Sequence, residues 1–506
     1  MLKSLRRNIE IVKTHFIGDG SSLQNRFLKG FIWSFLNVVL GQGLNFVSNI
    51  ILARSLGKEI FGQLWLIINT FTTFGIFLSF GFGITLTKYL ASYKTADIKK
   101  AGLLIGNVLL IVCAVSLTGL ISISVWPDKT AAIFLGSTHL GEKFQIACHL
   151  LLINVLINIF TGALSGLEAF KEVTKLNIIK SVVFIVCILL LFSNLTLDYA
   201  LIFTIISGYL SCIYGYYLLK GKCRNFSINM RIDLFSFDLK VVRDYSLPAF
   251  FMTAVTFPTT WYAQTILAKA HNGYSEIGVL NAANQWQNFI MLIPTMLSSV
   301  ALPLFSSEIE SEDGKNGVAY LMNKNQKLSV LVIIPIAIVL FSVTELIMGI
   351  YGTEYKTGKD VLLFILLGIS ISAIGYPAGT FIQARGKMWL AFTMNFLWSC
   401  ILVGSTQLFS ERLGAFSYAL GFSAAHIFLL VWGYLSVKEH IPADMLKRTF
   451  LITGLLILLA VYCYLAPAVL KLYLIIPLLA VFFYYALDIS DITKILMILR
   501  QKQTQI

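Results

Sequence analysis

Four amide side chains recur along one segment of membrane-spanning length, residues 277–303. Their spacing of i, i+3, i+4 and i+7 places them on one face of a helix: Asn281, Asn284, Gln285 and Asn288. This face is not expected to meet lipid, because an unpaired amide in hydrocarbon costs several kcal/mol. The amides could bond to neighbouring helices, or they could line a hydrated cavity that binds the hydroxyl groups of a sugar-like solute. The concentration of four amides on one face favours the cavity.

Two other apolar segments carry polar stripes of the same kind. Asn37 and Asn45 lie in residues 31–53, and Gln264 follows a run of threonines in residues 246–268. For a single Ser or Thr in such a stripe, bonding between helices is the favoured interpretation. Pro258 and Pro294 are expected to kink their helices and could gate a passage between them.

Basic side chains near the ends of these segments could bind an anion. Arg54 and Lys269 occupy matching places at the ends of residues 31–53 and 246–268, where a pair of cations could hold a diphosphate. The alternative is snorkelling, in which a long basic side chain reaches the membrane interface. Lys88 and Lys180 are open to both interpretations, and snorkelling is favoured for them.

Groups for ion coupling or catalysis are sparse. Residues 31–53 and 246–268 contain no Asp or Glu, so both lack the usual carboxylate that binds a proton or sodium ion. His149 and His426 are isolated, which favours packing over a proton relay. There is no phosphate-binding loop, zinc motif or supported Ser/His/Asp arrangement. We therefore predict no catalytic residue, no metal and no cofactor, and the sequence identifies no coupling ion.

A short repeat relates the helices that position these residues. The first copy is Ile51-Leu52-Ala53-Arg54, followed by Gly57, Glu59, Ile60 and Gly62. The second copy is Ile266-Leu267-Ala268-Lys269, followed by Gly273, Glu276, Ile277 and Gly278. Each copy ends one hydrophobic segment, makes a turn and begins the next. Such a repeat predicts two similar helical halves, and membrane proteins built in this way usually carry a solute through the seam between them.

The composition is that of a membrane protein. Of 506 residues, 57% are hydrophobic and 13% charged, and the mean hydropathy is +0.80, far from soluble proteins. We predict an all-α polytopic protein with about 14 transmembrane helices. Placing the N-terminus inside gives the inner segments about 29 Lys and Arg and the outer loops about 9. The net charge of +14 is thus largely a signal of topology, and no nucleic acid is expected as a partner.

The predicted organisation follows the repeat. Residues 1–30 form a cytoplasmic amphipathic segment on the membrane surface, and residues 31–219 an N-terminal six-helix bundle. A cytoplasmic loop, 220–245, leads to a C-terminal six-helix bundle, 246–436. Residues 437–506 add a final helix pair, helices 13 and 14, and a cytoplasmic tail.

Several short sequence motifs resemble those of bacterial Wzx-type flippases. The superfamily of these flippases also includes MATE drug exporters and the lipid II flippase MurJ. The motifs are the first repeat copy, residues 81–83 followed by Lys88, residues 350–355 and residues 384–387. The resemblance covers the first twelve predicted spans and implies two bundles forming a V-shaped cavity. Arg54 matches the family's first-turn Arg, and Lys88 its basic residue at the end of the second span. Relatives often place cations in the seventh or eighth span, where this chain has amides.

The resemblance implies a flippase in the bacterial inner membrane with both termini in the cytoplasm. It would move an oligosaccharide on undecaprenyl diphosphate to the outer leaflet by alternating access, for O-antigen, capsule or exopolysaccharide synthesis. Its implied partners are that lipid-linked glycan, membrane lipids and the polysaccharide polymerase machinery. A MATE-like multidrug antiporter, a membrane polymerase or ligase acting on the glycan, and a structural partner of this machinery remain alternatives. The missing carboxylates argue against the antiporter, and the short outer loops argue against the polymerase or ligase.

Overall fold

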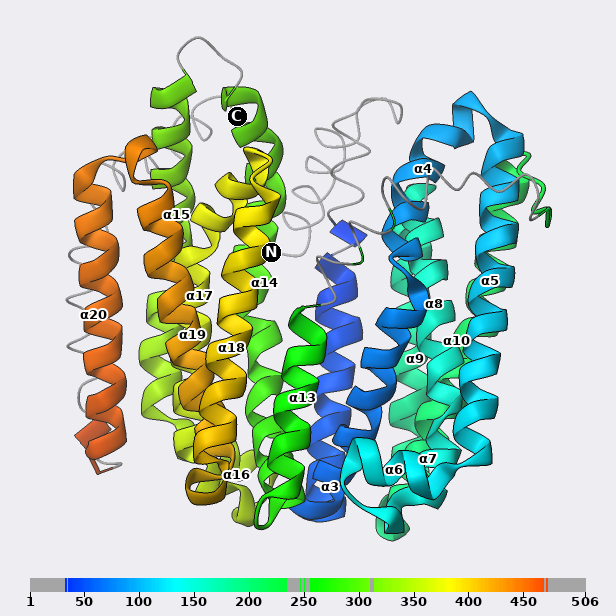
Figure 1. Cartoon of the computed structure of the whole chain (residues 1–506), viewed down its shortest axis with the longest axis horizontal. Helices are drawn as coiled ribbons and strands as arrows, with labels where there is room; N and C mark the ends of the chain where they lie inside the picture. The colour runs from blue at the N-terminus through cyan, green and yellow to red at the C-terminus, as the bar shows by residue number, and fades with distance from the viewer. Residues whose placement is uncertain are drawn as a thin grey trace, which may run out of the picture. The chain divides into compact units, whose positions relative to one another are not determined.

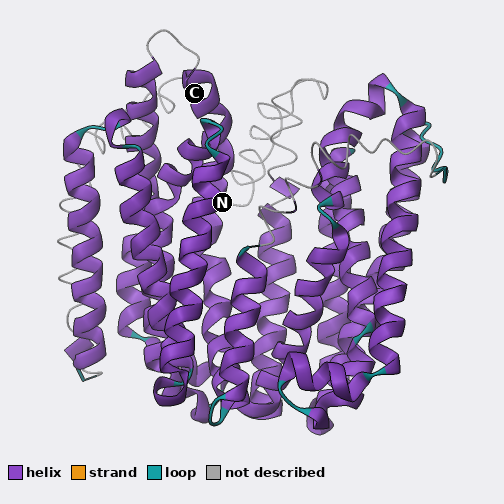
Figure 2. Ribbon diagram, in the orientation of Figure 1, coloured by secondary structure: helices purple, strands orange, loops and turns teal. Residues whose placement is uncertain are grey.

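The computed structural model describes residues 32–233 except residue 34, residues 246 and 250, and residues 255–309, 314–467 and 470–471. The predictions for the amphipathic segment 1–30, for residues 234–245 of the loop 220–245, and for most of the last span and the tail lie outside these residues. The first residues of that loop, up to Asn225, belong to α10. All regular secondary structure in the described part is helical (Figure 2). The all-α prediction is confirmed.

The chain divides into two compact units. Unit 1 comprises Met1–Leu56 and Leu66–Ala254, and unit 2 comprises Gly57–Trp65 and Val255–Ile506. The main helices of unit 1 are the π-helix η1 (Asn37–Gln42), α3 (Gly43–Ser79), α4 (Phe82–Ala96), α5 (Ile98–Val125), α6 (Pro127–Leu135), α7 (Gly141–Ala147), α8 (His149–Gly166), α9 (Phe170–Leu190) and α10 (Leu197–Asn225). Short 3-10 turns, η2 (Thr138–Leu140) and η3 (Phe192–Asn194), connect some of them.

Unit 2 begins, after the segment from α3, with the helices that carry the second repeat copy. Its elements are α13 (Thr256–Lys269), α14 (Gly273–Ile309), α15 (Gly314–Ser342), α16 (Thr344–Tyr351), η6 (Thr353–Gly358), α17 (Lys359–Ala384), α18 (Met388–Leu413), α19 (Ala415–Ser436), η7 (Lys438–His440) and α20 (Ala443–Leu465). The helix α17 is mostly buried and packs against α14, α15 and α19. Unit 2 is thus organised around α17.

Close backbone contact holds the helices of unit 1 together. A Cβ on Gly162 of α8 would lie 2.1 Å from the carbonyl oxygen of Gly83 in α4, so only glycine fits there. The hydroxyl of Thr87, also in α4, donates a hydrogen bond to the carbonyl oxygen of Gly162 at 3.0 Å. At one end of these helices, Lys94 and Glu168 form an ion pair at 2.6 Å.

The helix α3 changes direction at Gly57, whose φ of 73° and ψ of 166° are not helical. Before this point, Asn37 and Gly41 contact Asn177 and Ser181, so the chain runs parallel to α9. Beyond it, residues 75–83 meet residues 154–158 in the same order, parallel to α8. Because α8 and α9 run in opposite directions, the chain reverses at Gly57 (Figure 1). This reversal fits the two predicted spans 31–53 and 60–82.

Ten helical stretches within the described residues are long and apolar enough to cross a membrane. Val39–Ser79 counts as one of them, although it contains the reversal at Gly57. The predicted spans 246–268 and 277–303 are not among the ten, and α13 has only 14 described residues. The number of about 14 and the arrangement as two six-helix bundles therefore stay predictions.

Candidate functional site

The amide side chains on one face of α14 differ in burial and in hydrogen bonding. Asn281 is buried, and its Nδ2 donates to the Ile277 carbonyl at 2.9 Å, so its own helix uses one of its donors. Asn284 and Gln285 are half-buried. The Oδ1 atom of Asn284 is buried and accepts no hydrogen bond from the described residues. The side chain of Asn288 lies outside the description. Asn284 therefore has a buried acceptor oxygen that is available to a ligand.

The predicted residues of α13 lie at its two ends and in its middle. Gln264 is buried, and Lys269 is exposed as the last residue of the helix, where a cation complements the helix dipole. Pro258 is the third residue of α13, and a proline in the first turn removes no intrahelical hydrogen bond. Pro294, in contrast, is buried inside α14, so it is the proline that weakens a helix interior.

In unit 1, Asn37 has a partner. Its Oδ1 accepts from the Nδ2 of Asn177 at 3.1 Å, and Ser181 donates to the Gly41 carbonyl at 3.0 Å. Thr174 donates to the Trp33 carbonyl at 2.8 Å. Three polar residues of α9 thus bind the residues that lead into and form η1. For Asn37 this geometry supports the interpretation as bonding between helices, whereas Asn45 is exposed.

The role of α9 was not predicted, although the sequence contains a signal for it. Thr174, Asn177 and Ser181 follow one another at i, i+3 and i+7, the same spacing that identified α14. The π-helix η1 lies opposite them. Sequence spacing alone gives no sign of a π-helix, which is often found at functional positions.

The predicted cation positions differ in depth. Arg54 and Lys88 are exposed, and the Nζ of Lys88 lies 5.4 Å from the centroid of the Tyr89 ring. Because α9 begins at Phe170, the half-buried Lys180 lies about 15 Å along that helix. This is deeper than expected from a span beginning at residue 176. Arg54 and Lys88 belong to unit 1, and Lys269 belongs to unit 2.

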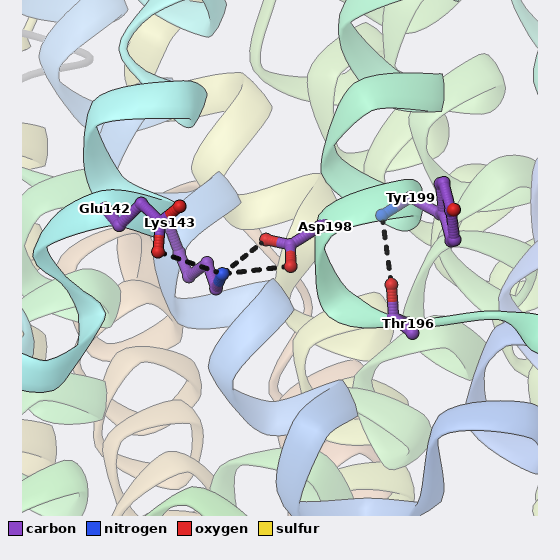
Figure 3. A network of polar contacts seen from close by, with 5 residues as sticks. All are labelled: Glu142, Lys143, Thr196, Asp198 and Tyr199. Atoms are coloured by element: carbon purple, nitrogen blue, oxygen red, sulfur yellow. Dashed lines mark hydrogen bonds and ion pairs between the residues drawn. The ribbon is translucent and has the colours of Figure 1, made fainter.

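A further charged cluster of unit 1 joins α7 to α10. The Nζ of Lys143 lies 2.8 Å from a carboxylate oxygen of Asp198 and 3.4 Å from Glu142 (Figure 3). The hydroxyl of Thr196 accepts from the Tyr199 amide at 3.4 Å and caps α10. Asp198 thus lies in the first turn of α10, where a carboxylate complements the helix dipole, and it has a cation partner there.

The predicted site residues are amides and cations, which can bind polar solutes. No group of three or more potential metal ligands occurs among the residues that the structure describes. Unit 1 supplies exposed cations on α3 and α4. Unit 2 supplies amides on α13 and α14 and one cation at the end of α13. Such groups can bind sugar hydroxyls and phosphate oxygens without breaking bonds in them.

Comparison with known sequences identifies relatives in polysaccharide export. A family model described as polysaccharide biosynthesis protein matches residues 27–308. The EPS I polysaccharide export inner membrane protein EpsE of Ralstonia nicotianae is 24% identical over 221 residues, 42% of this chain and 49% of that protein. The EpsE protein of Ralstonia solanacearum matches to the same extent. The chain thus matches about half the length of these relatives.

Solved structures share the fold. The lipid II flippase MurJ in an inward closed conformation has a TM-score of 0.69 and 16% identity, covering 90% of this chain and 99% of that one. An inward-facing MATE family multidrug resistance transporter of the MOP superfamily has a TM-score of 0.65 and 14% identity, covering 81% and 98%. The family resemblance read from the sequence is confirmed.

Proposed function

The chain belongs to the polysaccharide biosynthesis protein family, and on this premise we propose that it is a flippase for lipid-linked oligosaccharide. It moves a glycan on undecaprenyl diphosphate from the cytoplasmic to the outer leaflet of the inner membrane by alternating access. The observation that carries this proposal is the family match, which includes both repeat copies and most of α14. The shared fold with a lipid II flippase supports it.

In this proposal the cations offset the charge of the diphosphate. Moving a bare diphosphate into hydrocarbon is prohibitive, so it needs positive partners along its path. Arg54, Lys88 and Lys269 are exposed and carry that charge on three different helices. Arg54 has the planar guanidinium that matches two phosphate oxygens at once. The lipid tail stays in the bilayer, so only the headgroup needs polar contacts.

The amides replace water around the sugar. Asn284, with a buried unbonded oxygen, and Gln285 beside it are the main contacts. We assign further sugar contacts to Gln264 and Asn281 of unit 2 and, in unit 1, to Asn45. Asn37 and Asn288 stay candidates from the sequence pattern alone. Neutral amides suit this role because they bind hydroxyl groups as donors and acceptors. Bending of α14 at Pro294 would gate the passage, whereas Pro258 lies in the first turn of α13 and is not expected to bend that helix.

A drug antiporter is the second candidate, favoured by the shared fold with a MATE family transporter. Its usual requirement is a carboxylate within the corresponding helices. Residues 31–53 and α13 contain neither Asp nor Glu. Loss of resistance to cationic drugs on deletion of the gene would favour this candidate over the flippase.

The decisive experiment is mass spectrometry of membrane lipids from cells depleted of the protein, combined with a leaflet assay. We expect completed diphosphate-linked oligosaccharide to accumulate on the cytoplasmic side, and its mass would identify the sugar. Accumulation in the outer leaflet would instead indicate a polymerase or ligase. No accumulation on either side would refute the flippase.

A further inference from the structure

Three polar side chains are buried close together on α15, within the stretch Gly317–Ser342, which is long and apolar enough to cross a membrane. The exposed fractions are 7% for Asn325, 3% for Gln326 and 1% for Ser329. Hydrocarbon offers no hydrogen bond to a polar group, so each of these side chains needs a partner inside the protein.

Gln326 has its partner on another helix. Its Nε2 atom donates a hydrogen bond to the hydroxyl of Thr449 in α20, and that hydroxyl donates to the carbonyl oxygen of Met445 at 2.8 Å. Gln326 thereby connects α15 to α20 within unit 2.

The other two side chains are in a different situation. The Nδ2 atom of Asn325 and the Oγ atom of Ser329 are buried, and neither forms a hydrogen bond with the residues that the structure describes. Most buried polar groups in proteins are paired with protein atoms or with ordered water. Two such groups on one face of one helix therefore point to a ligand.

Similar side chains elsewhere in unit 2 bond to their own helix. The hydroxyl of Ser342, also in α15, donates to the carbonyl oxygen four residues before it at 2.9 Å. Asn281 of α14 donates to the carbonyl oxygen four residues before it, also at 2.9 Å. Asn325 and Ser329 do not use the corresponding carbonyls. Their polar atoms are therefore directed away from the backbone of α15, toward the helices packed against it, which include α14 and α17.

The donor and acceptor properties of the two groups restrict the ligand. The Nδ2 atom of Asn325 can only donate, whereas the Ser329 hydroxyl can donate or accept, so the ligand must accept a hydrogen bond. A metal cation or an ammonium ion does not meet this requirement. A bare anion would need a positive partner in the membrane interior. Lys324 and Lys327 lie at least about 100° around the helix from both side chains, and the Nζ of Lys324 lies 5.8 Å from the centroid of the Tyr320 ring.

We propose that Asn325 and Ser329 bind a water molecule inside unit 2. The two residues are four positions apart on one face of α15, so their Cβ atoms lie about 6 Å from each other. Two hydrogen bonds of about 2.9 Å that meet at one oxygen atom span this separation. The water accepts from the Nδ2 atom and bonds to the hydroxyl, so both buried groups are satisfied, as by ordered water in other protein interiors. The site needs only the fold of unit 2 and is independent of the proposed transport.

The first test is a structure of the full-length, unmodified protein at a resolution that shows ordered water, from crystals grown with bromide in place of chloride. We expect one peak of density within about 3.2 Å of both the Nδ2 atom of Asn325 and the Oγ atom of Ser329, without anomalous signal from bromine. An anomalous peak would overturn the inference, because the ligand would then be an anion. Absence of density, with both side chains bonded to protein atoms instead, would also overturn it.

The second test removes one of the two ligands of the water. Ser329→Ala should fold, because alanine is the residue most favourable to a helix, and it should abolish the peak. Ser342→Ala is the matched control, since it removes a serine of the same helix that donates to its own backbone, and the peak should remain. A peak unchanged in Ser329→Ala would show that Ser329 does not bind the water and would overturn the bridge.

The third test uses no variant for its main result and distinguishes water from an anion in solution. The unfolding temperature of the full-length protein in detergent is measured in sodium chloride and in sodium gluconate at equal ionic strength. We expect the two temperatures to agree within about 1 °C, because a site that binds water gains no stability from chloride. A higher unfolding temperature in chloride that disappears in Ser329→Ala would identify an anion site and overturn the inference.

Discussion

Unit 1 has ion pairs in addition to neutral hydrogen bonds such as that of Asn37 with Asn177, and the cross-helix pairs compared with them in unit 2 are neutral. In unit 1, ion pairs join the ends of helices: Lys94 with Glu168, Lys143 with Asp198, and Lys222 with Glu172. In unit 2, neutral groups bond across helices, as in Gln326 with Thr449, Thr380 with Ser298, and Trp398 with His426. An ion pair needs at least partial access to water, whereas a neutral pair can be buried at little cost. The difference lies in how the helices of each unit are held together.

The largest expected effect of this difference is on the stability of unit 1. The Lys94 side chain is only 9% exposed, so Glu168→Ala would leave a mostly buried ammonium group without its carboxylate. We expect a loss of about 2 kcal/mol, discounted because Glu168 itself is 34% exposed. Thermal unfolding in detergent, followed by intrinsic fluorescence, measures it.

The control is a pair that should contribute almost nothing. Lys100 and Asp97 lie 3.6 Å apart, and both side chains are well exposed, at 63% and 39%. Asp97 also caps α5 by accepting from the Lys100 amide, so the variant is Lys100→Ala, which keeps the cap. An equal loss of stability from Lys100→Ala and Glu168→Ala would remove the distinction between buried and exposed pairs in unit 1.

The next largest effect is expected at the amides of α14. The double substitution Asn284→Leu and Gln285→Leu removes the two half-buried amides of α14 while keeping side-chain volume close to the original. We expect headgroup transfer to fall about 30-fold, the equivalent of about 2 kcal/mol of lost hydrogen bonding. The rate of fluorescence quenching at the outer leaflet of vesicles measures it. Transfer within twofold of the parent protein would exclude α14 from the site.

Much of the fold and the family could be predicted from the sequence. The helical fold and the family followed from hydropathy and from short phrases, and the repeat pointed to residues 57–62 and 273–278. The mutual contact of those segments could not be predicted, because spacing along the chain gives no information about which backbone atoms meet. It depends on Gly62 and Gly278 lying close together, which is a property of the folded chain.

The candidate site was harder to predict for a similar reason. Asn37 and Asn284 are both amides in polar stripes, and the sequence treats them alike. In the structure Asn37 accepts from Asn177, while the Oδ1 of Asn284 is buried without a partner among the described residues. Hydrogen bonding between distant segments separates an amide with a structural role from one available to a ligand.

A smaller effect is expected at Arg54. Arg54→Ala should slow headgroup transfer about tenfold, whereas Arg54→Lys, which keeps the charge but loses the planar guanidinium, should slow it about threefold. Because Arg54 is exposed, neither change should alter the unfolding temperature by more than about 1 °C. Equal rates for the two variants would indicate that Arg54 only anchors its helix at the membrane interface. Arg54 would then be excluded as a ligand of the diphosphate.

The smallest effect distinguishes the two kinds of amide directly. Asn37→Leu removes the acceptor for Asn177, and we expect it to cost about 1 kcal/mol of stability while leaving headgroup transfer within twofold of the parent protein. Asn177→Leu should cost a similar amount, and the double variant should cost less than the sum, because neither amide is then left unpaired. Thermal unfolding of the four proteins measures this coupling. If Asn37→Leu instead slowed transfer as strongly as the Asn284 and Gln285 substitutions, while the two stability losses simply added, then Asn37 would contact substrate. The distinction between a structural amide at Asn37 and a binding amide at Asn284 would then fail.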